Sequence, residues 1–173
     1  DLYDYVSRDG QIYFCMADVS GKGTDAALVM AKTHSLFRSL SRNMPAVNEL
    51  AARMNGELVE TAFNGMFVTA IIGQYDPQSG AMQCCNAGHE PGLLVDGTGR
   101  FSYVEASLQP LGILDFAPHE IDVEHHSLEA ARFFWCFLHL SLSFVAYRSM
   151  NRLTIHTCVN RTHEAKLSAN SLT

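Results

Sequence analysis

The residues best suited to chemistry lie in one short stretch of this 173-residue chain, Ala17-Asp18-Val19-Ser20-Gly21-Lys22-Gly23-Thr24. Asp18 follows directly after an apolar run over 12–17, and a helical pattern begins after the stretch. Ionised oxygens are the ligands that Mg²⁺ and Mn²⁺ prefer, and the two glycines allow a ligand to approach the backbone closely. The stretch therefore indicates a site for a hard cation, with an ordinary turn and helix cap as the alternative.

A phosphate-binding P-loop is excluded, although Gly21-Lys22-Gly23-Thr24 resembles one. The P-loop motif needs its Lys to be followed directly by Ser or Thr. Here Gly23 intervenes, and Met16 stands where the first glycine of the motif belongs. The glycines of this stretch therefore do not indicate nucleotide binding.

A second carboxylate is expected beside Asp18. Two strand-like runs flank Asp9-Gly10, and Asp-Gly in that position is a strong signal for a β-hairpin. The hairpin puts Asp1 and Asp18 at the same end of the strand pair, with Asp4 further along the first strand. Two adjacent carboxylates repel unless a cation lies between them; for Asp1 and Asp4 a solvated strand end is the alternative.

Composition limits the class of protein. The length suits one domain with a sizeable core. The formal net charge of −6 argues against nucleic-acid binding, because phosphate contacts need clustered Lys and Arg. Five cysteines without framework spacing indicate a reducing compartment. No signal-peptide pattern is present, so a cytoplasmic location is expected.

The periodicity predicts an α+β fold, with helices packed on one face of antiparallel sheet layers. Helices are expected over 25–42, capped by Thr24 or Asp25, and from Pro45 to Asn64-Gly65. Strands are expected over 67–75, 82–87, 92–95, 101–104 and 119–126. His34 and the histidines at 119, 125 and 126 are expected to be packed or solvated, since no zinc-type ligand spacing includes them.

Composition changes sharply near residue 128. All 12 glycines and all five prolines lie at or before Pro118, and only Glu164 of the 18 acidic residues follows Glu129. The apolar run over 131–147 is shorter than the roughly 20 residues of a spanning helix. We therefore expect a buried helix in this run and no membrane span.

Laid out in this way, the chain resembles the SpoIIE/RsbU type of PP2C-like (PPM) serine/threonine protein phosphatases. The matching segments stand in the order of that family: Asp1-Leu2-Tyr3-Asp4, Ala17-Asp18-Val19-Ser20-Gly21-Lys22-Gly23, Ala26-Ala27-Leu28, Phe67-Val68-Thr69-Ala70, Asn86-Ala87-Gly88-His89-Glu90-Pro91 and Pro110-Leu111-Gly112-Ile113.

The resemblance implies an αββα sandwich, incomplete here at its C-terminal end, with a two-metal Mn²⁺ or Mg²⁺ site between the sheet edges. It implies that Asp1, Asp18 and the Val19 carbonyl are metal ligands, that Asp4 supports them, and that His89 shapes its loop. The nucleophile would be a metal-activated water, so no protein side chain is assigned as catalytic. The implied substrates are phosphoserine and phosphothreonine in proteins, commonly STAS-type anti-sigma-factor antagonists of bacterial sigma-factor signalling.

The resemblance ends at about residue 128. The later aspartates of the family, in a TDG strand and a late Asp-Asp pair, have no counterpart, since no Asp follows Asp122. The carboxylates of Glu120, Asp122 and Glu124 stand outside any recognisable motif. We therefore divide the chain into a partial phosphatase domain, 1–128, and an atypical tail, 129–173, from a frameshift or an unrelated extension. A catalytically impaired pseudophosphatase, or a regulatory binding module or fragment, is the alternative function.

Overall fold

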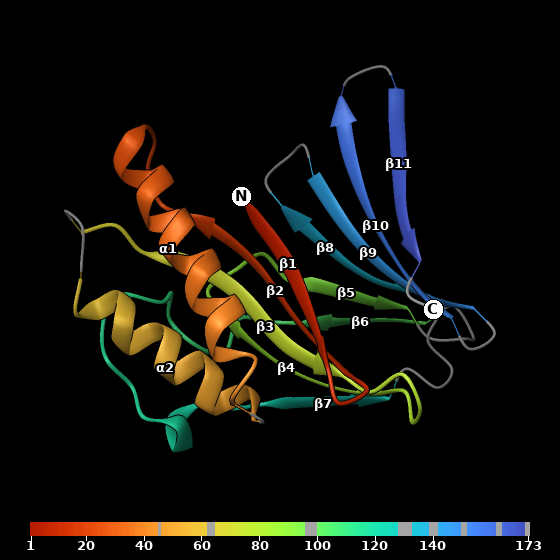
Figure 1. Ribbon diagram of the computed structural model, residues 1–173, viewed down its shortest axis with the longest axis horizontal. Coiled ribbons are helices and arrows are strands. Elements are labelled where there is room, and N and C mark those ends of the chain that lie inside the picture. Colours follow the sequence, from red (N-terminus) through yellow and green to blue (C-terminus); the bar gives the residue numbers. More distant parts are fainter. Residues whose placement is uncertain are drawn as a thin grey trace.

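The computed structural model places two helices against one face of an antiparallel sheet, and a second sheet on its other face (Figure 1). The structure describes residues 1–44, 46–61, 65–95, 100–127, 133–138, 142–149, 152–161 and 164–171, and side chains up to residue 127 except that of Val95. The predicted α+β class is confirmed: one helix layer covers the first of two packed antiparallel sheets.

The first sheet carries the hairpin predicted from Asp9-Gly10. Its strands lie in the order β1 (Leu2–Arg8), β2 (Gln11–Val19), β3 (Val68–Tyr75), β4 (Ala81–Ala87) and β7 (Glu124–Ser127). Each pair of adjacent strands in this sheet is antiparallel. Asp9 and Gly10 have φ of 52° and 77°, the left-handed conformation that a tight hairpin turn requires. The hairpin prediction is therefore confirmed.

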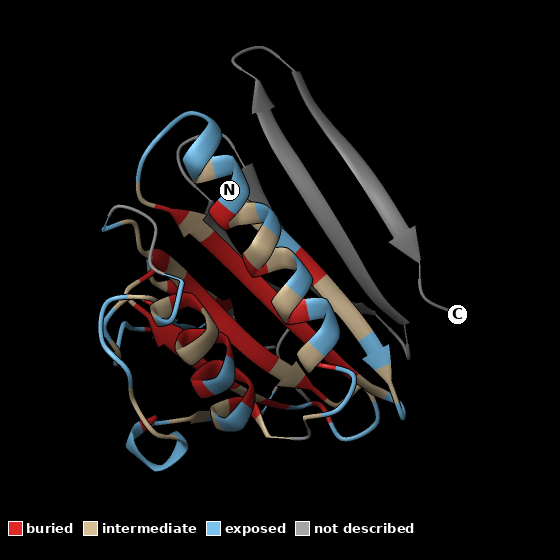
Figure 2. Cartoon of the chain, turned by 60° about the vertical axis from the view of Figure 1, so that its left-hand side comes forward, coloured by how far each residue is buried: buried red, intermediate tan, exposed pale blue. Residues whose placement is uncertain are grey.

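Two helices, α1 (Thr24–Leu40) and α2 (Val47–Val59), cover this sheet. Strand side chains alternate between faces, so Tyr13, Cys15 and Ala17 of β2 pack in the helix-facing core while Phe14 and Met16 are buried on the opposite face. Figure 2 shows the buried residues concentrated on the central strands beneath the helices. The strand β2, which ends in Asp18 and Val19, is thus buried on both faces and rigidly placed.

The start of α1 differs from the prediction. Its N-cap is Gly23, with φ of 84°, rather than Thr24 or Asp25. The tight loop that connects β2 to α1 reaches the helix through a left-handed residue, which favours glycine over a side-chain cap. Thr24 is consequently already the first helical residue.

The second sheet contains the C-terminal tail. Its strands lie in the order β11 (Glu164–Ser171), β10 (Arg152–Arg161), β9 (Leu142–Ser149), β8 (Phe133–Leu138), β5 (Gly92–Val95) and β6 (Phe101–Val104). The buried helix expected over 131–147 is wrong, since β8 and β9 occupy most of that run. Aromatic and β-branched residues favour strands, and β5 offers a free edge to which β8 pairs.

The strand expected over 119–126 is also partly wrong. Pro118–Glu120 forms one 3-10 turn (η1), and the strand β7 begins at Glu124. Pro118 fixes φ for a turn and cannot donate to a sheet ladder, so the strand starts later. No helix among the described residues has both the length and the apolar character needed to cross a bilayer.

Candidate metal centre

Asp1 and Asp18 meet at the open end of the β1–β2 hairpin. The last register pair is Leu2↔Ala17, so Asp1 lies opposite Asp18. The Asp1 α-amine is 3.5 Å from Asp18 Oδ1, and the side chains are 17% and 38% exposed. Both residues are thus close together and accessible to solvent, in the arrangement that the hairpin register requires.

The Val19 carbonyl is directed toward the same place. Val68, its partner in β3, exchanges both of its backbone hydrogen bonds with Leu111 instead (2.9 and 2.8 Å). In an antiparallel ladder a pair that does not exchange hydrogen bonds points its N–H and C=O groups outward. The N–H and C=O groups of Val19 therefore point toward the β1 side of the sheet, where Asp1 directly precedes β1.

The same alternation assigns Asp18 to the inter-sheet side. Asp18 shares its face of β2 with Phe14 and Met16, which are buried away from the helices. Across the ladder, Thr69 Oγ1 donates to the Asp18 carbonyl at 3.3 Å and lies 2.9 Å from Nδ1 of the buried His89. The position of Asp18 is therefore held by β3 and by the loop that carries His89.

Asp4 does not join this carboxylate pair. It lies three residues along β1 and faces the helix, where Arg38 donates to both of its oxygens (2.6 and 2.7 Å) and His34 Nε2 lies 2.9 Å away. The Tyr5 amide donates a further bond of 2.9 Å. Hydrogen bonding to Asp4, together with its charge, raises the pKa of Arg38. Asp4 is thus a buried anchor between β1 and α1.

Two buried asparagines hold loops of the domain in place, a role that the sequence patterns did not predict. The Asn86 side chain donates to the carbonyls of His89 (3.1 Å) and Val104 (3.0 Å) and accepts the His89 amide (2.8 Å). From α2, Asn55 donates to Leu114 O and accepts the Gly112 amide, both at 2.9 Å. The signal available for Asn86 was its place in the NAGHEP motif; for Asn55 it was an amide within the apolar face of a predicted helix.

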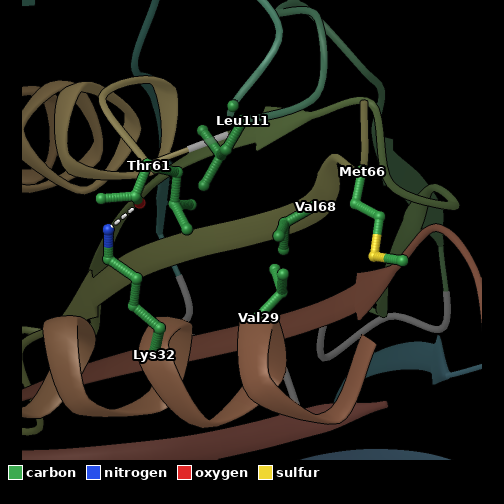
Figure 3. A pocket seen from close by; sticks show the side chains of 8 residues that line it. Val29, Lys32, Thr61, Met66, Val68 and Leu111 are labelled. Atoms are coloured by element: carbon green, nitrogen blue, oxygen red, sulfur yellow. Dashed lines mark hydrogen bonds between the residues drawn. The ribbon is translucent and has the colours of Figure 1, made fainter. Parts of the chain in front are cut away.

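A small pocket between the helices carries a cation that is already engaged (Figure 3). Its apolar lining includes Val29, Met66, Val68 and Leu111. Lys32 donates from α1 to the Glu57 carbonyl and to the Thr61 hydroxyl at the end of α2. A cation is favourable at a helix C-terminus, where carbonyls lack partners. Lys32 therefore joins the two helices and leaves the pocket no free charged group.

The later carboxylates lie far from the hairpin end. Glu124 begins β7, which occupies the opposite edge of the sheet from β1. Within the part of the chain that the structure describes, no three His, Cys, Asp or Glu side chains are grouped as a metal site. The open end of the hairpin nevertheless holds the carboxylates of Asp1 and Asp18 and the outward-facing carbonyl of Val19. Hard divalent ions accept such donors and fill their remaining positions with water, so the set fits the protein part of a site for one ion.

Most of the chain matches the model of a known protein family. The model for Stage II sporulation protein E (SpoIIE) matches residues 8–136. The chain belongs to the SpoIIE family. The match covers β2, with Asp18 and Val19, and the loops that Asn55 and Asn86 hold; it begins beyond Asp1.

Curated relatives of this SpoIIE-family chain are phosphatases by name. Phosphoserine phosphatase RsbU of Bacillus subtilis (strain 168) is 29% identical over 114 residues, covering 65% of this chain and 34% of RsbU. Phosphoserine phosphatase RsbP of the same organism is 28% identical over 120 residues, covering 66% of this chain and 30% of RsbP. The chain thus spans about a third of the length of the curated relatives that it matches.

Solved structures show the same fold. The PP2C phosphatase domain of SpoIIE from Bacillus subtilis superposes with a TM-score of 0.65 at 18% identity, covering 78% of this chain and 40% of that one. The RsbU and RsbW domains of Rv1364c from Mycobacterium tuberculosis give a TM-score of 0.64 at 23% identity, covering 84% and 38%. RsbX in complex with magnesium gives 0.60 at 14% identity, covering 84% and 64%. The predicted PP2C-like architecture is confirmed.

Proposed function

We propose that this chain is a metal-dependent phosphoserine/phosphothreonine protein phosphatase domain. The observation that carries the proposal is the pairing of Asp1 with Asp18 at the open end of the hairpin, with the Val19 carbonyl turned toward them. The likeness to RsbU and RsbP, both named phosphoserine phosphatases, supports the assignment of the reaction.

In this proposal Asp1, Asp18 and Val19 hold Mn²⁺ or Mg²⁺. When bound, such ions supply stabilisation of the charge on phosphoryl oxygens and a water of lowered pKa as the nucleophile. The residues of the chain bind and orient: Thr69 fixes the Asp18 backbone, and β3 holds β2 in register. No side chain acts as a covalent nucleophile. The magnesium complex of RsbX, a structure of the same fold, supports the choice of metal.

We propose a phosphorylated protein of the STAS type, in the cytoplasm, as the substrate. Two similar structures support this choice through their own descriptions, one containing RsbU and RsbW domains and one coming from work on the bacterial stressosome. The exposed position of Asp18, 38% accessible, suits a phosphoseryl side chain on another protein better than it suits a small enclosed ligand.

The test is hydrolysis by the purified chain. Initial rates on p-nitrophenyl phosphate and on a phosphoserine-containing STAS protein are measured against Mn²⁺ concentration for wild type, Asp18→Ala and Asp9→Asn. Asp9 is a matched control, because it lies at the other end of the same hairpin with φ of 52°, which Asn tolerates. Activity that rises with Mn²⁺, survives in Asp9→Asn and disappears in Asp18→Ala is the expected result.

Absence of hydrolysis by a folded wild-type chain contradicts the proposal. If that inactive chain still binds the phosphorylated STAS protein, the regulatory binding module becomes the better description. Circular dichroism on each variant separates loss of chemistry from loss of the fold.

A further inference from the structure

The loop between β2 and α1 is fixed at both ends. The Ser20 amide donates to the Phe67 carbonyl at 2.9 Å, and the Phe67 amide donates to Ser20 Oγ at 2.8 Å. At the other end Gly23 is the N-cap of α1. Gly21 and Gly23 have φ of 118° and 84°, conformations that L side chains rarely adopt. The residue between these glycines, Lys22, is therefore presented from a tightly constrained backbone.

Lys22 is a cation with its charge unused. It is exposed, and among the residues that the structure describes its ammonium makes no hydrogen bond or ion pair. Two other cations of the neighbouring helix α1 are engaged: Arg38 binds Asp4, and Lys32 binds the end of α2. The left-handed Gly23 serves the tight entry into α1, whereas the exposed ammonium of Lys22 makes no hydrogen bond or ion pair within the described residues that would stabilise the fold.

Lys22 follows Asp18 closely along the chain. Three residues lie between them, so the two Cα atoms are at most about 14 Å apart even if this segment were fully extended. A phosphate monoester dianion approaching Asp1 and Asp18 meets both of their carboxylates, and the Asp1 α-amine, 3.5 Å from Asp18 Oδ1, offsets only one of these two charges. An ammonium group with three donors compensates such charges, because Lys binds phosphate as a compact point charge.

We propose that Lys22 binds the phosphoryl oxygens of the phosphoserine or phosphothreonine substrate and draws the dianion to the carboxylate pair. The inference rests on the proposed function, which supplies the substrate. It assigns the lysine of the SGKG loop a role in substrate binding, separate from that of the metal ligands.

The test compares three single-residue variants of the full chain. Lys22→Gln removes the ammonium group, Lys22→Arg keeps a cation, and Arg42→Gln removes an exposed cation beyond the opposite end of α1. Arg42→Gln changes the net charge by the same amount, so it corrects for non-specific attraction. Dissociation constants for inorganic phosphate in the presence of Mn²⁺ are measured by titration calorimetry, and KM and kcat are measured with p-nitrophenyl phosphate.

Lys22→Gln is expected to raise the phosphate dissociation constant and KM by roughly tenfold, the low end of what a hydrogen bond to a charged group contributes, with kcat changed less than KM. Lys22→Arg is expected to retain most of the affinity, and Arg42→Gln to match wild type. Equal phosphate affinity in Lys22→Gln and Arg42→Gln would overturn the inference, as would a wild-type chain that does not bind phosphate.

The two proposals fail separately. If wild type hydrolyses p-nitrophenyl phosphate and Lys22→Gln hydrolyses it equally well, the proposed function stands and the role of Lys22 is refuted. If wild type shows no turnover but its phosphate affinity still falls in Lys22→Gln, the role of Lys22 in phosphate binding stands and the phosphatase proposal is refuted.

Discussion

Replacing Arg38 by Gln tests how β1, and with it Asp1, is anchored to α1. The Asp4 side chain is 9% exposed, whereas the Arg38 side chain is 49% exposed. Arg38→Gln leaves a buried carboxylate with His34 and the Tyr5 amide as partners, so the free energy of unfolding should fall by about 2–3 kcal/mol, below the usual range for a fully buried pair because Arg38 is half in water. Asp4→Asn leaves Arg38 free to turn into solvent and should cost about 1–2 kcal/mol.

The assay is urea unfolding followed by circular dichroism at pH 7, with thermal unfolding as a check. For a domain of this size the Arg38→Gln loss corresponds to a fall in Tm of about 5–10 °C. The double variant should cost less than the sum of the two single losses, since each single change already breaks the contact. Arg53→Gln, which removes an exposed i,i+4 pair with Glu57 of 2.8 Å, should cost less than about 0.5 kcal/mol. Additive losses, or an Arg38→Gln loss no larger than that of Arg53→Gln, would refute this account of the anchor.

Three further predictions concern the fold and its titrating groups. Gly88→Ala should lower the free energy of unfolding by about 2–4 kcal/mol in urea unfolding, because Gly88 has φ of +66° and an added Cβ would lie 2.7 Å from Pro110 Cγ. Burial raises the pKa of the Cys85 thiol to about 12 from 9.0, so iodoacetamide at pH 8, followed by peptide mass spectrometry, should modify Cys85 about a thousandfold more slowly in the folded than in the urea-unfolded chain. Hydrogen bonds, first from the Ser79 hydroxyl, lower the pKa of Asp76; Asp76→Ala should therefore destabilise the chain at pH 7, and its difference from wild type in urea unfolding should shrink as the pH falls from about 5 toward 2.

The Gly88→Ala prediction has a control within the chain, and each of the three predictions has an outcome that would contradict it. Gly10→Ala, with φ of +77° and nothing within 4 Å of the added Cβ, measures backbone strain without a clash. A Gly88→Ala cost equal to that of Gly10→Ala would contradict the contact with Pro110. Rapid modification of Cys85 in the folded chain would contradict its burial. An Asp76→Ala difference that persists unchanged at low pH would show that the carboxylate charge is not the source of its stabilisation.

Local signals in the sequence were enough to predict the hairpin and the neighbourhood of Asp1 and Asp18. Asp9-Gly10 fixes the turn, the turn fixes the register, and the register places Asp1 opposite Asp18. The strand period of two also separates Asp4 from Asp1, since an odd spacing places the two side chains on opposite faces. The partners of Asp4 in α1 could not be predicted, because they lie 30 and 34 residues away and depend on how the helix crosses the sheet.

The tail shows where the pattern was ambiguous. An apolar run without clear alternation fits a buried helix and a buried strand equally well. Here the run forms strands, and β8 pairs with the edge of β5. The roles of Asn55 and Asn86 were likewise invisible, since each depends on loops that fold back from distant parts of the chain. The division of the chain at residue 128 stays a prediction, as does the assignment of metal ligands.

Binding of Mn²⁺ tests the central claim most directly. Free Mn²⁺ is measured by its electron paramagnetic resonance signal during titration of wild type, Asp18→Asn and the hairpin-turn control Asp9→Asn. If Asp1, Asp18 and Val19 hold the ion, Asp18→Asn should weaken binding at least tenfold, because one of two charged ligands becomes a neutral amide, while Asp9→Asn should bind like wild type. Equal Mn²⁺ affinity in wild type and Asp18→Asn would contradict the account.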